Sequence, residues 1–124
     1  MKNKPIILIA GEPYSVFSEI FFKTLKSKVL LNYNRPLILI ASKKLFEEQM
    51  KKLHFKFKIN LINENKIKNK INNKMINIIN VDFFFKKTFD NISKKSSNYI
   101  NKCFQIGLKL MKNNKGFALI NGPV

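Results

Sequence analysis

The chain has 124 residues, and 24 Lys and Arg against 7 Asp and Glu give it a formal net charge of +17. This length accommodates one domain of ordinary size or part of a larger one, and a hydrophobic content of 45% excludes a disordered chain despite the charge. No apolar run approaches the ~18 residues that a membrane span requires. The start of the chain lacks a signal-peptide pattern, so we expect a cytoplasmic protein with no membrane partner.

The excess of lysine has two interpretations. Clustered Lys and Arg side chains would bind nucleic acid by neutralising its phosphates. In this chain, however, Arg35 is the single arginine, and the lysines are scattered along the whole sequence. Lys, Asn and Ile, which A/T-rich codons encode, occur 23, 17 and 17 times. We therefore attribute the charge mainly to codon usage and do not expect nucleic acid as a partner.

The first half of the sequence alternates apolar runs with helical patterns. Residues 5–10 and 36–41 are short apolar runs rich in branched side chains, as in strands buried on both faces of a parallel sheet. Apolar side chains at helical spacing predict helices over residues 15–28 and 42–53. Ser15 and Ser42 stand where these helices begin and are expected to be their N-caps.

The second half continues the alternation. Residues 57–62 predict a strand near an edge of the sheet, residues 63–74 a polar surface connection, and residues 75–81 a further buried strand. A long helix is expected from about Asn91 to a stop at residues 113–116, and residues 117–120 predict a last buried strand. The apolar face expected for that helix consists of Ile100, Cys103, Phe104, Gly107, Leu108 and Met111.

Strands that alternate with amphipathic helices define the fold class as α/β, with a mostly parallel or mixed sheet and helices on both faces. Ligands of such sheets bind at the carboxyl ends of the strands. Two segments lie there, Gly11-Glu12-Pro13 after the first strand and Asn121-Gly122-Pro123 after the last. Each could be only a loop between elements, or could line a substrate and cofactor cleft. Because α/β domains seldom stop just beyond a central strand, we expect residues 1–124 to be the N-terminal portion of a domain that is incomplete at its C-terminus.

Other chemistry-bearing residues have plainer interpretations. His54 follows the second predicted helix, where a histidine is favoured by the helix dipole. Cys103 shares an apolar stripe with Phe104 and is expected to pack in the core. The few acids are dispersed, so the sequence offers neither paired catalytic carboxylates nor a set of metal ligands. We therefore place no catalytic and no metal-binding residue in this chain.

The two segments at the strand ends resemble motifs of the 4-hydroxythreonine-4-phosphate dehydrogenase family. That family opens with a strand followed by Gly-[Asp/Glu]-Pro-Ala-Gly-Ile-Gly-Pro-Glu, and Gly11-Glu12-Pro13 and Glu19 match this pattern. Ser15, Phe17 and Ser18 replace its two middle glycines and second proline. The family's later Thr-Gly-Pro-[Val/Ile] corresponds to residues 121–124, with Asn121 in the Thr position. The resemblance covers the whole chain in order and spacing.

The resemblance implies an isocitrate/isopropylmalate dehydrogenase-like fold in a protein that is homodimeric at full length. It implies oxidation of 4-phosphohydroxy-L-threonine, a small phosphorylated hydroxy-amino acid, with NAD or NADP, followed by decarboxylation to 3-amino-2-oxopropyl phosphate in pyridoxal 5′-phosphate (vitamin B6) synthesis. It also implies a divalent metal (Zn, Mg or Co) held by three histidines downstream of this chain, which leaves the fragment itself inactive. Two alternatives stay open: a basic nucleic-acid-binding α/β module and a non-catalytic domain that binds a small ligand.

Overall fold

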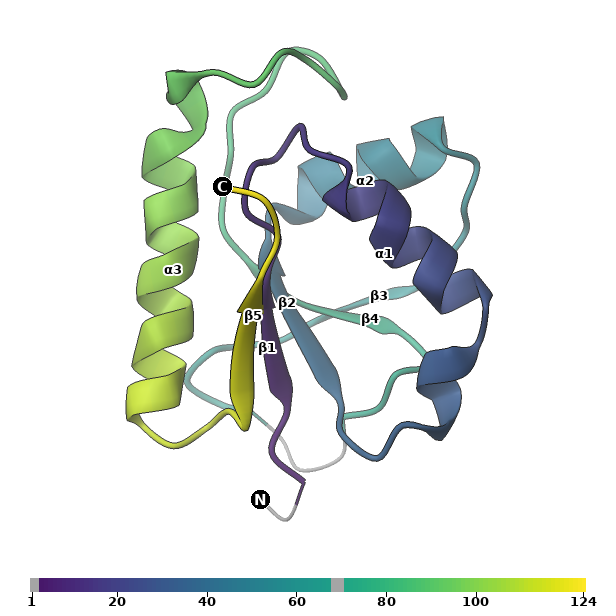
Figure 1. Cartoon of the computed structure of the whole chain (residues 1–124), viewed down its shortest axis with the longest axis vertical. Coiled ribbons are helices and arrows are strands. Elements are labelled where there is room, and N and C mark those ends of the chain that lie inside the picture. The colour runs from purple at the N-terminus through teal and green to yellow at the C-terminus, as the bar shows by residue number, and fades with distance from the viewer. Residues whose placement is uncertain (1–2, 68–70) are drawn as a thin grey trace.

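The computed structural model describes residues 3–67 and 71–124. Within this part of the chain five strands form one sheet in the order β3-β4-β2-β1-β5, and every neighbouring pair is parallel (Figure 1). The strands are β1 (Ile6–Ile9), β2 (Leu37–Ala41), β3 (Ile59–Leu61), β4 (Ile76–Asn80) and β5 (Ala118–Asn121). The helices are α1 (Phe17–Lys26), α2 (Lys43–Lys52) and α3 (Ser97–Lys112), and the 3-10 turns are η1 (Val29–Asn32) and η2 (Lys94–Ser96). The predicted α/β class is confirmed.

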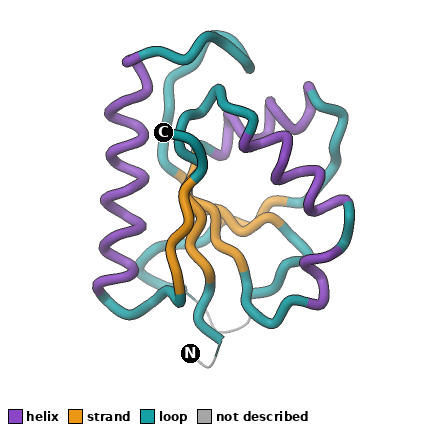
Figure 2. The backbone as a smooth tube through the Cα atoms, viewed as in Figure 1, coloured by secondary structure: helices purple, strands orange, loops and turns teal. Residues whose placement is uncertain are grey.

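Helices cover both faces of the sheet, as predicted (Figure 2). Alternate residues of each strand point to opposite faces, so Ile7 and Ile9 pack with Tyr99 and Cys103 of α3. The other face is covered by α1 and α2 and contains a second buried cluster. That cluster consists of Ala10, Phe21, Phe22, Leu39, Ala41, Phe46, Met50, Ile76 and Ile78.

Phe22 is the centre of an aromatic group on the α1–α2 face. Its side chain is 0% exposed. Its ring centroid lies 4.7 Å from that of Phe46 in α2, 5.5 Å from that of Phe55 and 6.3 Å from that of Phe57. These rings join α1, α2 and the segment before β3 into one packed unit.

Four predicted helix-end positions can be compared with the structure, and three of them are confirmed. Ser42 is the N-cap of α2, and its Oγ accepts a hydrogen bond of 3.3 Å from the Leu45 amide. His54 ends the same helix with a left-handed backbone, φ 62°, and the Phe55 amide bonds back to the Met50 carbonyl, which is the Schellman arrangement. Asn114 ends α3 in the same way, with φ 59°. The prediction of Ser15 as N-cap of α1 is wrong: the cap position is Val16, and Ser15, one residue earlier, accepts a hydrogen bond through its Oγ from the Phe17 amide at the start of the helix.

Three further expectations need correction. Leu108 is 59% exposed, because the buried side of α3 passes through Tyr99, Cys103, Gly107 and Leu110, and Leu108 lies one residue outside that stripe. This helix also begins at Ser97, after the turn η2, rather than near residue 91. The last strand, β5, is an edge strand of the described sheet and not a buried one, so Ile120 is 52% exposed.

The remaining predicted elements are confirmed with shorter bounds. β3 lies at the opposite edge of the sheet from β5, as expected for residues 57–62. The described parts of the connection that follows, residues 63–67 and 71–74, are exposed or half-buried, and residues 68–70 of that prediction lie outside the described residues. In the described part of the chain no helix has the length and apolar character to cross a membrane.

Candidate functional site

The carboxyl edge of the sheet places the two sequence motifs side by side. β1 and β5 are neighbours with Ile9 opposite Asn121, so the segments that leave them emerge together. The Gly122 amide donates a hydrogen bond of 2.8 Å to the Ile9 carbonyl, and the Glu12 amide donates one of 2.7 Å to the Pro123 carbonyl. Residues 11–13 and 121–123 therefore form one continuous wall, which we call the carboxyl-edge wall.

Two glycines allow this close approach. Gly11 has φ +78°, which side chains other than glycine rarely adopt, and a Cβ atom there would lie 2.2 Å from the Pro123 carbonyl oxygen. A Cβ on Gly122 would lie 2.5 Å from the Ala10 carbonyl oxygen. Both contacts are with backbone atoms, so neither can be relieved by turning a side chain. The glycines are explained by the packing of the wall itself.

Glu12 is the buried member of the wall, with 6% of its side chain exposed. Its Oε2 accepts a hydrogen bond of 2.9 Å from the Ser96 hydroxyl, and its Oε1 lies 3.4 Å from the Tyr14 amide. Ser96 is the N-cap residue of α3, so the carboxylate lies at the positive end of that helix. Glu12 thus joins the loop after β1 to α3, which covers the face of the sheet opposite to α1 and α2.

The other segment of the wall is more open to solvent, because Asn121 and Pro123 are exposed.

Gln49 positions Pro13 and is a site residue that the sequence does not single out. It is 2% exposed, and its Nε2 donates hydrogen bonds to the carbonyl oxygens of Pro13 at 2.8 Å and Thr88 at 3.2 Å. Its side chain thereby joins α2 to the loop after β1 and to the loop after β4. The available signal was a polar residue on the otherwise apolar face of the predicted helix.

We expect Gln49→Leu to lower the free energy of unfolding by about 2 kcal/mol, because two buried carbonyl groups lose their donor. Urea denaturation of the variant and the parent chain measures this change. The matched control is Gln105→Leu on α3, where the glutamine is exposed and the expected change is within about 0.5 kcal/mol. Equal effects of the two substitutions would show that the Gln49 hydrogen bonds do not hold the loops.

Tyr99 makes a second long-range link at this edge. Its hydroxyl oxygen accepts a hydrogen bond of 2.7 Å from the Ser42 amide at the start of α2. Burial raises the pKa of the Tyr99 phenol above its ordinary value, so the group stays neutral. Tyr99 is not among the residues that the sequence predicts for the apolar face of this helix, and the sequence gives no signal of the hydrogen bond.

Cys103 is a packed core residue, as the sequence predicts, with 1% of its surface exposed. Burial raises the pKa of its thiol to about 12, so the thiol stays protonated at neutral pH.

We expect a thiol-specific disulfide reagent to leave Cys103 of the native chain unlabelled at neutral pH and to label it fully in denaturant. Rapid labelling without denaturant would contradict the burial of Cys103.

The described residues do not provide a metal site. Among residues 3–67 and 71–124 no three His, Cys, Asp or Glu side chains come together as metal ligands would. His54 lies exposed at the C-terminal end of α2. A divalent metal therefore does not fit this part of the chain.

The cavity behind the loop after β1 has a volume of about 10 Å³, which is far below the space that a dinucleotide fills. Farther along the carboxyl edge, a depression of about 400 Å³ lies at the ends of β3 and β4, lined by residues such as Leu61, Asn63 and Asn80. A larger depression of about 420 Å³ lies between α2 and the β3 edge, lined by charged and apolar side chains such as Lys43, Glu47 and Phe57. The wall alone is therefore one side of a cleft at most.

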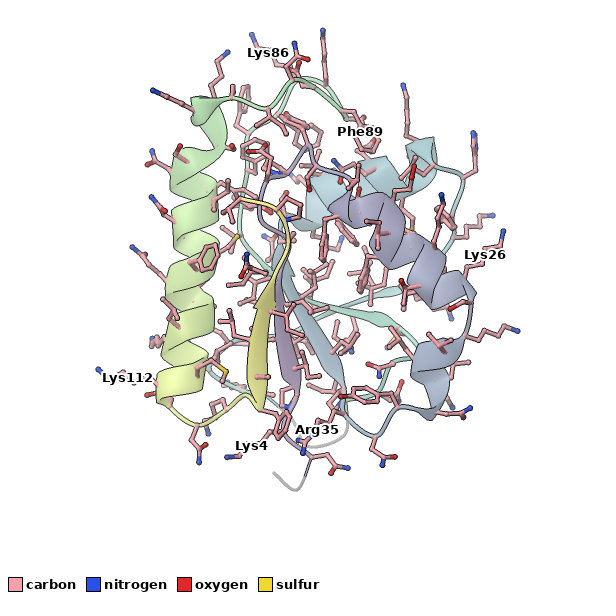
Figure 3. All side chains as sticks on the ribbon, in the orientation of Figure 1. Lys4, Lys26, Arg35, Lys86, Phe89 and Lys112 are labelled. Carbon is pink, nitrogen blue, oxygen red and sulfur yellow. The ribbon has the colours of Figure 1, made fainter. Side chains whose placement is uncertain are left out.

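Four lysines of the described part of the chain show how the basic side chains are distributed. The labelled amines of Lys4, Lys26, Lys86 and Lys112 lie on widely separated parts of the surface (Figure 3). A nucleic-acid site would concentrate such groups along one face or groove. The distribution is that expected for a lysine-rich solvent surface, and the absence of a nucleic-acid partner stays a prediction.

The chain thus has an α/β fold, with a parallel sheet, helices on both faces, and the loops after β1 and β5 joined at its carboxyl edge. Among solved structures it is similar to a 4-hydroxythreonine-4-phosphate dehydrogenase from Burkholderia phymatum, with a TM-score of 0.80 and 16% identity over 98% of this chain. It is similar to the same degree, with a TM-score of 0.80 and 15% identity over 98% of this chain, to a Salmonella typhimurium protein to which that activity is assigned. No protein-family model and no curated protein matches the sequence.

These likenesses confirm the resemblance at the level of the fold. The chain covers 36% of the Burkholderia phymatum protein and 38% of the Salmonella typhimurium protein, so it spans little more than a third of the length of each. The likeness extends over nearly the whole of this chain, from the first strand to the wall.

Proposed function

We propose that this chain forms the N-terminal portion of an NAD- or NADP-dependent oxidoreductase that acts on 4-phosphohydroxy-L-threonine. The observation that carries the proposal is the superposition of 98% of the chain on a 4-hydroxythreonine-4-phosphate dehydrogenase with a TM-score of 0.80. The carboxyl-edge wall adds support, because the two motif segments that suggest this family meet where α/β sheets bind ligands.

The role proposed for this portion is to line the cleft. Gly11 and Gly122 allow the two segments of the wall to pack closely, and Glu12 and Gln49 hold its buried side to α3 and α2. Asn121 is exposed and carries an amide that can both donate and accept hydrogen bonds toward a polar substrate. The nicotinamide cofactor, which takes up hydride, and a divalent metal (Zn, Mg or Co) are bound in this proposal by residues outside this chain.

The properties of the whole protein follow as parts of the same proposal. It is a cytoplasmic homodimer whose oxidised product loses carbon dioxide to give 3-amino-2-oxopropyl phosphate for pyridoxal 5′-phosphate synthesis. In this proposal residues 1–124 alone have no turnover, because the metal ligands and most cofactor contacts lie outside this chain; among the described residues no three His, Cys, Asp or Glu side chains come together as metal ligands would.

The gene sequence past the codon for Val124 tests the assignment of residues 1–124 to a longer enzyme. We expect the reading frame to continue and to encode histidines that can serve as metal ligands. A stop codon directly after Val124 would overturn this assignment.

A further inference from the structure

A small cavity lies behind the carboxyl-edge wall, between the start of α1 and the start of α2. Its volume is about 10 Å³. The polar residues that line it are Glu12, Ser18, Ser42, Gln49 and Tyr99, and its remaining lining is apolar. It therefore joins, in one place, the loop after β1, the turn from β2 to α2, and α3.

Ser18 is the unusual member of this lining. The residue is 4% exposed, and its Oγ has no hydrogen-bond partner among residues 3–67 and 71–124. Buried hydroxyl groups in folded proteins are almost always hydrogen-bonded to protein or to ordered water, because an unpaired one costs the free energy of its lost hydration. The other polar groups of the lining have partners: Ser42 Oγ accepts from the Leu45 amide, and Tyr99 Oη accepts from the Ser42 amide.

The size of the cavity limits what can bind there. A water molecule needs about 10–15 Å³ of such space and two to four polar partners. The cavity has about 10 Å³, the volume of one water molecule by this measure, and is too small for a phosphate group or an organic ligand. Both Glu12 oxygens and the Tyr99 hydroxyl retain further hydrogen-bonding capacity, since a carboxylate has about four acceptor positions and a phenol can donate as well as accept.

We propose that this cavity is a binding site for a single buried water molecule, which hydrogen-bonds to Ser18 Oγ and links it to the polar groups of Glu12 and Tyr99. The water completes the hydrogen bonding of the first turn of α1 and joins it to the start of α2 and to the wall. The inference does not depend on the proposed enzymatic function.

Ser18→Ala distinguishes a Ser18 hydroxyl that is hydrogen-bonded to water from an unpaired one by the direction in which the melting temperature changes. If water occupies the cavity, the variant loses its hydrogen bond and the melting temperature falls by about 3 °C. If Ser18 Oγ is buried and unpaired, its removal eliminates an unfavourable group and the melting temperature rises. The matched control is Ser97→Ala, an exposed serine in the first turn of α3, for which we expect a change within about 1 °C. A rise for Ser18→Ala overturns the proposal.

A high-resolution crystal structure of the parent chain tests the site without any substitution. We expect electron density for one water at about 2.8 Å from Ser18 Oγ. An empty cavity at that resolution overturns the proposal, whatever the stability of the variants.

Discussion

Phe22→Ala is expected to lower the free energy of unfolding by about 3–5 kcal/mol, the largest effect of any substitution considered. Phe22 is fully buried, and its ring packs against Phe46, Phe55 and Phe57. Truncation removes the transfer free energy of the ring and leaves a cavity among three side chains from two other segments, α2 and the segment before β3. Those segments cannot both move inward to fill it. Urea denaturation followed by circular dichroism measures the change.

Phe84→Ala is the matched control for this substitution. Phe84 lies in the loop after β4 and is 83% exposed, so its removal should change the free energy of unfolding by no more than about 0.5 kcal/mol. A loss below about 1.5 kcal/mol for Phe22→Ala would mean that the aromatic group does not form the packed unit that joins α1 and α2.

Gly11→Ala is expected to cost about 3 kcal/mol and to separate the two segments of the carboxyl-edge wall. Part of this cost is the left-handed backbone at Gly11, φ +78°, which costs a residue with a Cβ about 1–2 kcal/mol. The rest comes from the Cβ itself, which would lie 2.2 Å from the Pro123 carbonyl oxygen and would break the hydrogen bond from the Glu12 amide to that oxygen. Denaturation gives the cost, and amide exchange at Glu12 reports the lost contact.

The double variant Gly11→Ala/Gly122→Ala tests whether both glycines act in the same contact. Once the Cβ of one alanine has separated the two segments, the second Cβ has more space. The double variant should therefore lose less free energy of unfolding than the sum of the losses in the two single variants. Gly107→Ala is the control, because the atoms nearest to its Cβ would belong to the side chains of Ile9 and Leu119 and not to the backbone. Additive effects of Gly11 and Gly122 would contradict a shared wall.

The buried strands were predictable because parallel sheets leave a local pattern. β1 and β2 are covered on both faces, so each is a short run of branched apolar residues that stands out from the lysine-rich remainder. β4 follows the same pattern less strictly, because Asn77 interrupts its buried isoleucines. The edge strands were harder to place. β5 is as apolar in sequence as a buried strand, and its position at an edge follows from strand order, which the local pattern does not contain.

The candidate site was predictable as two separate segments and not as one structure. The sequence places Gly11-Glu12-Pro13 and Asn121-Gly122-Pro123 at strand ends, but their hydrogen bonds depend on β5 being the neighbour of β1. The contacts that hold the wall from behind involve residues far apart in the chain, such as Ser96 with Glu12 and Gln49 with Pro13. No spacing rule connects these pairs, so only the folded structure identifies them.

The formation of NADH or NADPH tests the proposed activity most directly. The purified product of the complete reading frame, supplied with 4-phosphohydroxy-L-threonine and Zn, Mg or Co, should reduce NAD or NADP. Residues 1–124 alone should not, and this chain is the matched control. A complete product that reduces neither cofactor with any of these metals would contradict the account, and so would equal turnover by residues 1–124 alone.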